Sequence, residues 1–336
     1  MRLTLLASVL LAAVNVDAFA PSITGAGRAG VSVLQSAVEE ATEATTISAA
    51  DYNSKLEAQL AKMASKDAES KALSKEDLNV VFEDEHILVV DKPAGVLCVP
   101  NKDNSPSLSQ AVFDAYGSES GRADKMVVHR LGMDTSGLVV FARTEAALKG
   151  MNTLFRTRQV TRSYEALVCG SIEEDEGVIN MPLMRDYENP PYMRVSTDEH
   201  QRALMGLSAE DVGKKLLERP KESLTKFAVA GKEELEGNAV SRVTLSSISG
   251  RTHQLNVHCA AFGHPIVGDK VYGINGEAAA NGGLEEGTSS SKASVELQEA
   301  IASASGDKPM CVHAKTISFE HPVTGEKMSW SSDTPF

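Results

Sequence analysis

Short apolar and β-branched runs recur along this chain between turn signals, and each has the length of a strand. We predict strands at residues 79–82, 87–90, 138–142, 163–169, 225–229, 240–246 and 254–259. The stretch Glu145–Arg156 is typical of a helix. Many strands with few helices predict an α+β domain, built on a mainly antiparallel mixed sheet with flanking helices.

The other segments divide the chain around this domain. Residues 51–76 place Leu and Ala among Lys and Glu at helical spacing, which predicts a helical linker before a domain over residues 77–336. Residues 274–309 are rich in Gly, Ala, Ser and Glu and predict a surface insertion. We expect a second insertion near residues 202–222.

The first residues have the features of a targeting sequence. The apolar run Leu3–Val14 is too short to span a bilayer, and small residues around Ala18 predict a signal peptide over residues 1–18. The string AFAP at residues 18–21 resembles the bipartite presequences of algae with secondary plastids, such as diatoms. Residues 19–50 are rich in Ser, Thr, Ala and Gly, as a disordered transit peptide is, although they include three glutamates. We therefore expect a plastid protein with no membrane segment in its mature form. Secretion is the alternative, and it fits unpaired cysteines poorly.

Charge is unevenly distributed along the chain. The net charge of −13 argues against a polyanionic partner, because phosphate binding needs lysine and arginine. Between Arg122 and Arg162, however, eight basic residues stand against three acidic ones, and such a strip can direct RNA to one face. The four cysteines are far apart and the eight histidines form no metal-binding pattern. We expect buried free thiols and no metal.

Four motifs and a closing stretch carry a family resemblance. The segment HRLGMDTSG, His129–Gly137, resembles the active-site motif HRLDxxTSG of RluA-type RNA pseudouridine synthases. ILVVDKPAGVLCVP at 87–100, TRSYEALVCG at 161–170 and GRTHQLNVHCAAFGHPIVGDKVY at 250–272 resemble further motifs of this family in the same order. The closing stretch VHAKTISFEHPVTGEKMSW resembles its last strands, so the resemblance covers most of residues 77–336.

The resemblance implies an enzyme that isomerises uridine to pseudouridine in structured RNA, either rRNA or tRNA. No cofactor is expected, because nothing is oxidised and no group is imported. The uridine would be flipped out of its stack, at a cost of about a few kcal/mol. Arg130 would fill the vacated place, and Tyr164 would pack on the flipped base. The candidate RNA contacts are Arg130, Arg156, Arg158, Arg162, Arg251 and His253.

The catalytic position departs from the family pattern. Gly132 stands where the motif has its catalytic aspartate, and Asn256 stands where the family has the arginine that pairs with it. Loss of one partner alone would leave a buried unpaired charge, at about 3–5 kcal/mol. The absence of both the aspartate and its arginine avoids this cost, so the two substitutions fit together.

Asp134, two residues after Gly132, is the candidate substitute for the missing carboxylate. Its alternative role is to stabilise the turn by accepting hydrogen bonds from nearby backbone amides. Two functions follow. One is a pseudouridine synthase in which Asp134 or another group acts, and the other is a catalytically impaired RNA-binding or RNA-folding paralogue.

Overall fold

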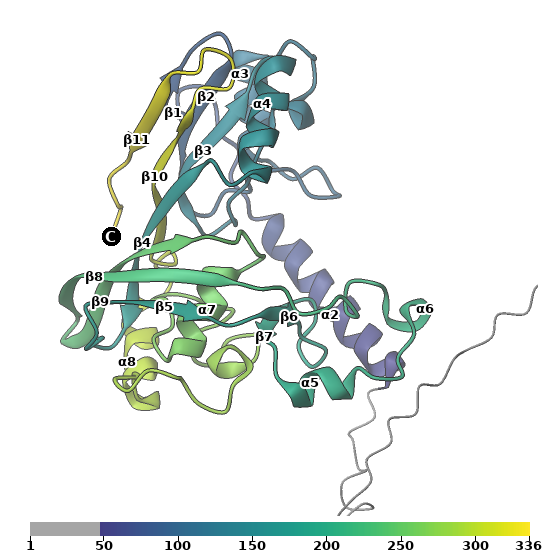
Figure 1. The fold of residues 1–336 in the computed structure, drawn as a ribbon, viewed down its shortest axis with the longest axis vertical. Coiled ribbons are helices and arrows are strands. Elements are labelled where there is room, and N and C mark those ends of the chain that lie inside the picture. The colour runs from purple at the N-terminus through teal and green to yellow at the C-terminus, as the bar shows by residue number, and fades with distance from the viewer. Residues whose placement is uncertain (1–47) are drawn as a thin grey trace, which may run out of the picture. The chain divides into compact units, whose positions relative to one another are not determined.

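The computed structural model describes residues 48–336 (Figure 1). The strands are β1 (Asn79–Glu83), β2 (Ile87–Lys92), β3 (Ser136–Ala142), β4 (Thr161–Cys169), β5 (Glu176–Asn180), β6 (Leu183–Arg185), β7 (Met193–Val195), β8 (Leu224–Leu235), β9 (Asn238–Ser247), β10 (Val312–Glu320) and β11 (Lys327–Ser331). The α-helices are α2 (Ala49–Asp67), α3 (Leu108–Tyr116), α4 (Glu145–Arg156), α5 (Asp198–Ala203), α6 (Ala209–Val212), α7 (Gln254–Phe262) and α8 (Val295–Ser305), with 3₁₀ turns η2 (Ala123–Met126) and η3 (Ala280–Gly283).

Nine strands form one mixed sheet, which confirms the predicted fold class. The order is β1-β2-β3-β10-β4-β9-β8-β5, and β11 pairs with the outer part of β10. Every pairing is antiparallel except that of β10 with β3. In Figure 1, β4 and β10 run between the β1–β3 half and the β5–β9 half. A separate small sheet pairs β6 with β7.

The two faces of β2 and β3 are covered by different helices. Successive strand residues point to opposite faces, so Ile87 and Val89 pack with Met151 of α4. Leu88 and Val90 pack on the other side with Leu108 of α3. Both faces are therefore buried, which explains why the apolar run of β2 is nearly continuous.

The other half of the sheet is covered by α7 and α8, and the sequence predicted neither helix. Residues 254–259 were expected to form a strand, and this prediction is wrong. Leu255, Val257 and Cys259 alternate with polar residues as in a strand, yet they lie on a helix. Because α7 is buried on most sides, its sequence shows no single apolar stripe.

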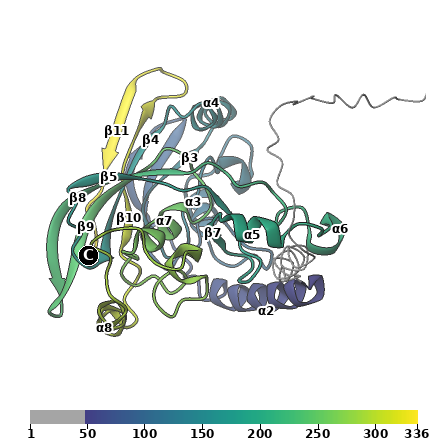
Figure 2. The same cartoon turned by 60° about the horizontal axis from the view of Figure 1, so that its bottom comes forward.

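Residues 51–76 are not a free linker. Helix α2 is capped by Ser48 and contacts the segment near residues 202–222, where Tyr52 packs with Val212 and Leu216 (Figure 2). The stretch 274–309 is likewise packed on the domain, since Ile301 of α8 is buried against strand residues such as Leu167. Both stretches are polar in composition, and burial of a few apolar residues in each holds them in place.

The described residues also bear on the cysteine and membrane expectations. All four cysteines are free and buried, as predicted. Within residues 48–336 no helix is long and apolar enough to cross a membrane, and no cluster of three metal-ligating side chains occurs. The predicted signal peptide and the predicted transit peptide, up to residue 47, lie outside the described residues.

Gly137 lets β10 approach β3, and its replacement tests the parallel pairing. Its φ is 113°, and a Cβ atom there would lie 2.4 Å from backbone atoms of Ala314. We expect Gly137→Ala to lower the free energy of unfolding by about 3 kcal/mol or more, or to prevent folding. Gly121 is the control, because it has a φ of 65° but no atom within 4 Å of an added Cβ. Gly121→Ala should cost only about 1–2 kcal/mol. Equal losses in chemical denaturation would contradict the steric explanation.

Candidate active site

A buried lysine holds the loop of the HRLGMDTSG motif, His129–Gly137, which we call the signature loop. Lys92, at the end of β2, is fully buried, and its ammonium donates hydrogen bonds to the carbonyls of Pro93, Val96 and Met133 at 2.8, 2.8 and 2.9 Å. The Met133 carbonyl also accepts from the Gly95 amide at 2.9 Å. Burial lowers the pKa of Lys92 to about 8. The KPAG turn and the signature loop are thereby joined at one point.

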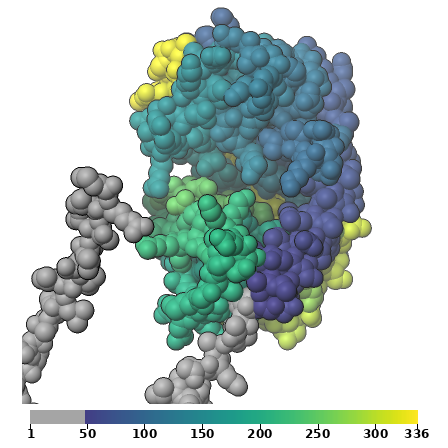
Figure 3. Space-filling model, turned by 90° about the vertical axis from the view of Figure 1, so that its right-hand side faces the viewer, coloured from purple at the N-terminus to yellow at the C-terminus, as the bar shows by residue number. Residues whose placement is uncertain are grey.

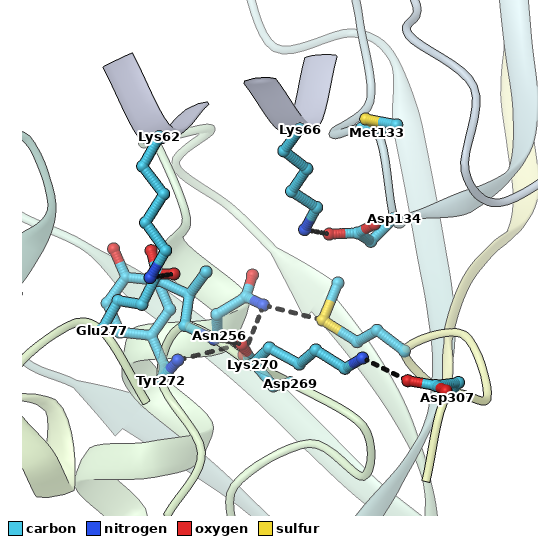
Figure 4. Close-up of polar contacts among 12 residues, drawn as sticks. Lys62, Lys66, Met133, Asp134, Asn256, Asp269, Lys270, Tyr272, Glu277 and Asp307 are labelled. Carbon is cyan, nitrogen blue, oxygen red and sulfur yellow. Dashed lines mark hydrogen bonds and ion pairs between the residues drawn. The ribbon is translucent and has the colours of Figure 1, made fainter. Parts of the chain in front are cut away.

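Asp134 projects from this loop toward helix α2. One of its carboxylate oxygens lies 2.6 Å from the ammonium of Lys66 (Figure 4). No backbone amide in the described residues donates to this carboxylate, and the turn closes instead through the Thr135 amide and the Gly132 carbonyl at 3.2 Å. Its side chain is 39% exposed. The structure therefore gives Asp134 no turn-stabilising hydrogen bond.

Asn256 faces a different carboxylate. Its amide donates to Asp269 at 2.8 Å and to the sulfur of Met310 at 3.2 Å (Figure 4). The second oxygen of Asp269 accepts from the backbone amides of Val271 and Tyr272, both at 2.9 Å. Burial raises the pKa of Asp269, and the nearby charge of Asp134 adds to the shift. Both Asp269 oxygens are thus occupied by hydrogen bonds that shape the loop after α7.

The surroundings of Gly132 correct one expectation. Gly132 is exposed, and a Cβ there would meet only the Thr135 hydroxyl at 3.5 Å. An aspartate at this position would not be a buried charge, so it would need no arginine at position 256 for stability. The coupling between the two positions is therefore not a folding requirement in this structure.

The other motif residues divide into exposed and packed side chains. Arg130 is exposed and forms no salt bridge within residues 48–336. Tyr164 is 7% exposed and shares a core cluster with Leu131 of the signature motif. His129 accepts a hydrogen bond from the Val140 amide at 2.9 Å, and burial, with Arg162, lowers its pKa to about 3. His129 is therefore a neutral structural group.

The predicted RNA contacts occupy two regions. Arg156 and Arg158 are exposed at the end of α4, and Arg162 of β4 lies over the Phe155 ring at 5.5 Å. Arg251 and His253 come from the loop before α7, where His253 bonds to the Tyr272 hydroxyl at 2.9 Å. The two regions meet at Arg162, whose guanidinium would lie 3.5 Å from a Cβ atom on Gly250, the residue before Arg251.

Two hollows lie near these residues. Figure 3 shows a hollow between the blue part of the chain and the green part, with the purple helix α2 beside it. The loop Gly250–Thr252 lines a pocket of about 280 Å³ together with residues from β6, β7 and the 202–222 region. Its basic members are Arg185, Lys215, Arg219, Lys221 and Arg251, and its acidic member is Glu218. This pocket is strongly basic on a chain of net charge −13.

Comparison with known proteins gives one consistent result. The RNA pseudouridylate synthase family matches residues 86–261. The dual-specificity RNA pseudouridine synthase RluA of Pasteurella multocida is 32% identical over 260 residues, which is 77% of this chain and 94% of the relative. The RluA of Haemophilus influenzae is 32% identical over 259 residues, again 77% and 94%. Among solved structures, human RNA pseudouridylate synthase domain containing 1 superposes with a TM-score of 0.56 at 26% identity, covering 79% of this chain and 87% of that one.

The chain therefore belongs to the RNA pseudouridylate synthase family. It is of the RluA type and is an isomerase that converts uridine to pseudouridine in RNA. The polar groups around positions 132 and 256 differ from an Asp–Arg pair. Figure 4 shows Asp134 with Lys66, and Asn256 with Asp269.

Two of these groups escaped prediction from the sequence. Lys66 lies 68 residues before its partner, in a helix interpreted as a linker. Asp269 is within the quoted GHPIVGDKVY motif, but its burial and its bond to Asn256 have no sequence signal.

Lys92→Met tests whether the buried ammonium holds the signature loop. The change leaves three carbonyl groups without their donor, so we expect the free energy of unfolding to fall by about 3 kcal/mol or more. Pseudouridine formation should fall as well, because Met133 and Asp134 lose their anchor. Lys102→Met is the control, since Lys102 is an exposed loop residue and should change stability by only about 0.5 kcal/mol. Similar stability for both variants in urea titrations would show that the three bonds are not needed.

Proposed function

We propose that this protein isomerises uridines of plastid rRNA or tRNA and that Asp134 is the carboxylate that acts at the sugar. The observation that carries the assignment is the position of Asp134, which contacts a cation and has no structural hydrogen bond to the backbone. Asp269 is the nearby rival, but its oxygens are engaged by Asn256 and two amides. A half-exposed carboxylate on the signature loop is the group that an entering nucleotide can reach.

The reaction needs little beyond such a group and a shaped pocket. The N1–C1′ bond breaks, the uracil turns, and a C5–C1′ bond forms. N1 gains a proton and C5 loses one, so the composition of the nucleotide does not change. The chain has to flip the base, hold it and stabilise the sugar while it is detached.

Arg130 and Tyr164 supply the contacts to the base in this proposal. Arg130 is exposed and unpaired within the described residues, so its guanidinium is available to enter the RNA stack. Tyr164 is nearly buried beside the signature motif, which gives a flipped base a fixed aromatic surface. The basic pocket beside Arg251 would hold phosphates of the flanking RNA.

Plastid targeting rests on the presequence. The signal-peptide features and the AFAP string support import into a plastid of an alga with secondary plastids. The dual specificity in the names of the bacterial relatives belongs to those proteins. Both rRNA and tRNA, the two classes that the motif resemblance implies, are the substrates to test here.

Asp134→Asn tests the catalytic assignment. We expect the rate of pseudouridine formation to fall by roughly 100-fold or more, because the amide lacks the charge and basicity of the carboxylate. Transcripts of plastid rRNA and tRNA are incubated with the protein, digested and separated as nucleosides by chromatography. Asp124→Asn is the control, since Asp124 is an exposed acid that, within residues 48–336, forms a salt bridge with Arg122 alone. Undiminished activity of Asp134→Asn would exclude Asp134. Absence of product with the unaltered protein, despite RNA binding, would instead support the impaired paralogue.

The double variant Lys215→Glu with Arg219→Glu tests the basic pocket. Each residue lines the pocket and is exposed. If each contacts one phosphate, the slope of log binding constant against log salt should become shallower by roughly 1.4–1.8. Filter binding of the same transcripts measures this slope. The control is Lys232→Glu with Lys327→Glu, two exposed lysines outside the pocket. Equal slopes for the two double variants would show that the pocket does not touch RNA.

A further inference from the structure

Helix α2 contacts the 202–222 segment near its start and the signature loop at its end. Near its start, the Asn53 side chain donates to the Asp211 carbonyl at 2.8 Å and Lys55 donates to the Glu188 carbonyl at 3.3 Å. One turn before its end, Lys62 pairs with Glu277. At its end, Lys66 reaches Asp134 on the signature loop. The helix therefore runs from the 202–222 segment to the signature loop, and Figure 4 shows Lys62 and Lys66 descending from it into the site.

Lys66 is the cation in contact with the carboxylate of the signature loop. Asn256 is neutral, and its side-chain amide donates a hydrogen bond to Asp269. Lys92 is nearby, but its ammonium is used by three carbonyls. Lys66 alone among the described residues forms a salt bridge with Asp134.

We propose that Lys66 is the positioning residue of this active site, orienting and neutralising the Asp134 carboxylate from helix α2. The inference rests on the proposed role of Asp134 and extends it to a helix outside the matched residues 86–261. In this arrangement helix α2, which precedes the matched residues, contributes to catalysis by holding Asp134 in place.

The exposure of the pair separates this role from a purely structural one. The side chains of Lys66 and Asp134 are 45% and 39% exposed, and such surface pairs contribute little to stability. Helix α2 keeps its other contacts when Lys66 is removed, including the buried Tyr52. When RNA fills the site, water is displaced and the same pair becomes stronger. Lys66 should therefore affect the reaction more than the fold.

The test uses the full mature chain with Lys66→Ala, Lys66→Arg and Lys62→Ala, in single-turnover reactions with excess protein. We expect Lys66→Ala to slow the chemical step roughly 10- to 100-fold, as misplacement of a reacting group commonly does. Its melting temperature and RNA dissociation constant should change little. Lys66→Arg should restore most of the rate. Lys62→Ala is the matched control, because it breaks the α2 contact one turn away without touching Asp134.

Adding Lys66→Ala to Asp134→Asn should cause no further loss of rate, because both changes remove the same interaction. An unchanged or raised rate in Lys66→Ala would overturn the inference, as would equal loss in Lys62→Ala. Weaker RNA binding with an intact rate at saturation would also overturn it, since it would make Lys66 a phosphate contact. These outcomes leave the role of Asp134 standing. Failure of that role is recognised separately, by full activity of Asp134→Asn alone.

Discussion

The buried ammonium of Lys92 is the contact on which the site depends. A charged group inside a protein needs polar partners, and Lys92 finds three carbonyl oxygens at the point where β2 ends. One of them belongs to Met133, so satisfaction of this charge fixes the residue before Asp134. The burial of β2 on both faces, between α3 and α4, makes this anchor rigid. The position of the signature loop is thus a consequence of core packing.

The charges around this loop are arranged differently from the pattern that the motifs suggest. Gly132 contributes no side chain, and Asn256 serves the buried Asp269. The carboxylate available at the surface of the site is Asp134, and its cation comes from α2. Because Gly132 is exposed, the fold tolerates this rearrangement without a buried unpaired charge. The site can therefore depart from the family motif while the domain around it remains intact.

The sequence predicted those parts of the structure whose patterns are local. Helix α4 was predicted with its observed bounds, and β1, β2, β3, β4 and β9 were predicted within two residues, because alternation and turn residues report on nearby neighbours. Strand β8 was predicted only over its first part, and β5, β6 and β7 were not predicted. Helix α7 was missed because burial on most sides removes the helical stripe. The role of α2 was missed for another reason, since Lys66 and Asp134 meet only through the tertiary fold. The motifs at residues 129–137 and 250–272 were found from the sequence, but neither could indicate that the partner of Asn256 is Asp269.

The most direct measurement is a crystal structure of the protein with a uridine-containing RNA that it modifies. We expect a flipped uridine beside Tyr164, with an Asp134 oxygen about 3–3.5 Å from the sugar carbon that reacts. We also expect Lys66 to contact this carboxylate in the complex. A structure in which Asp269 is the carboxylate at the sugar, or in which Lys66 has left Asp134 for an RNA phosphate, would contradict the account.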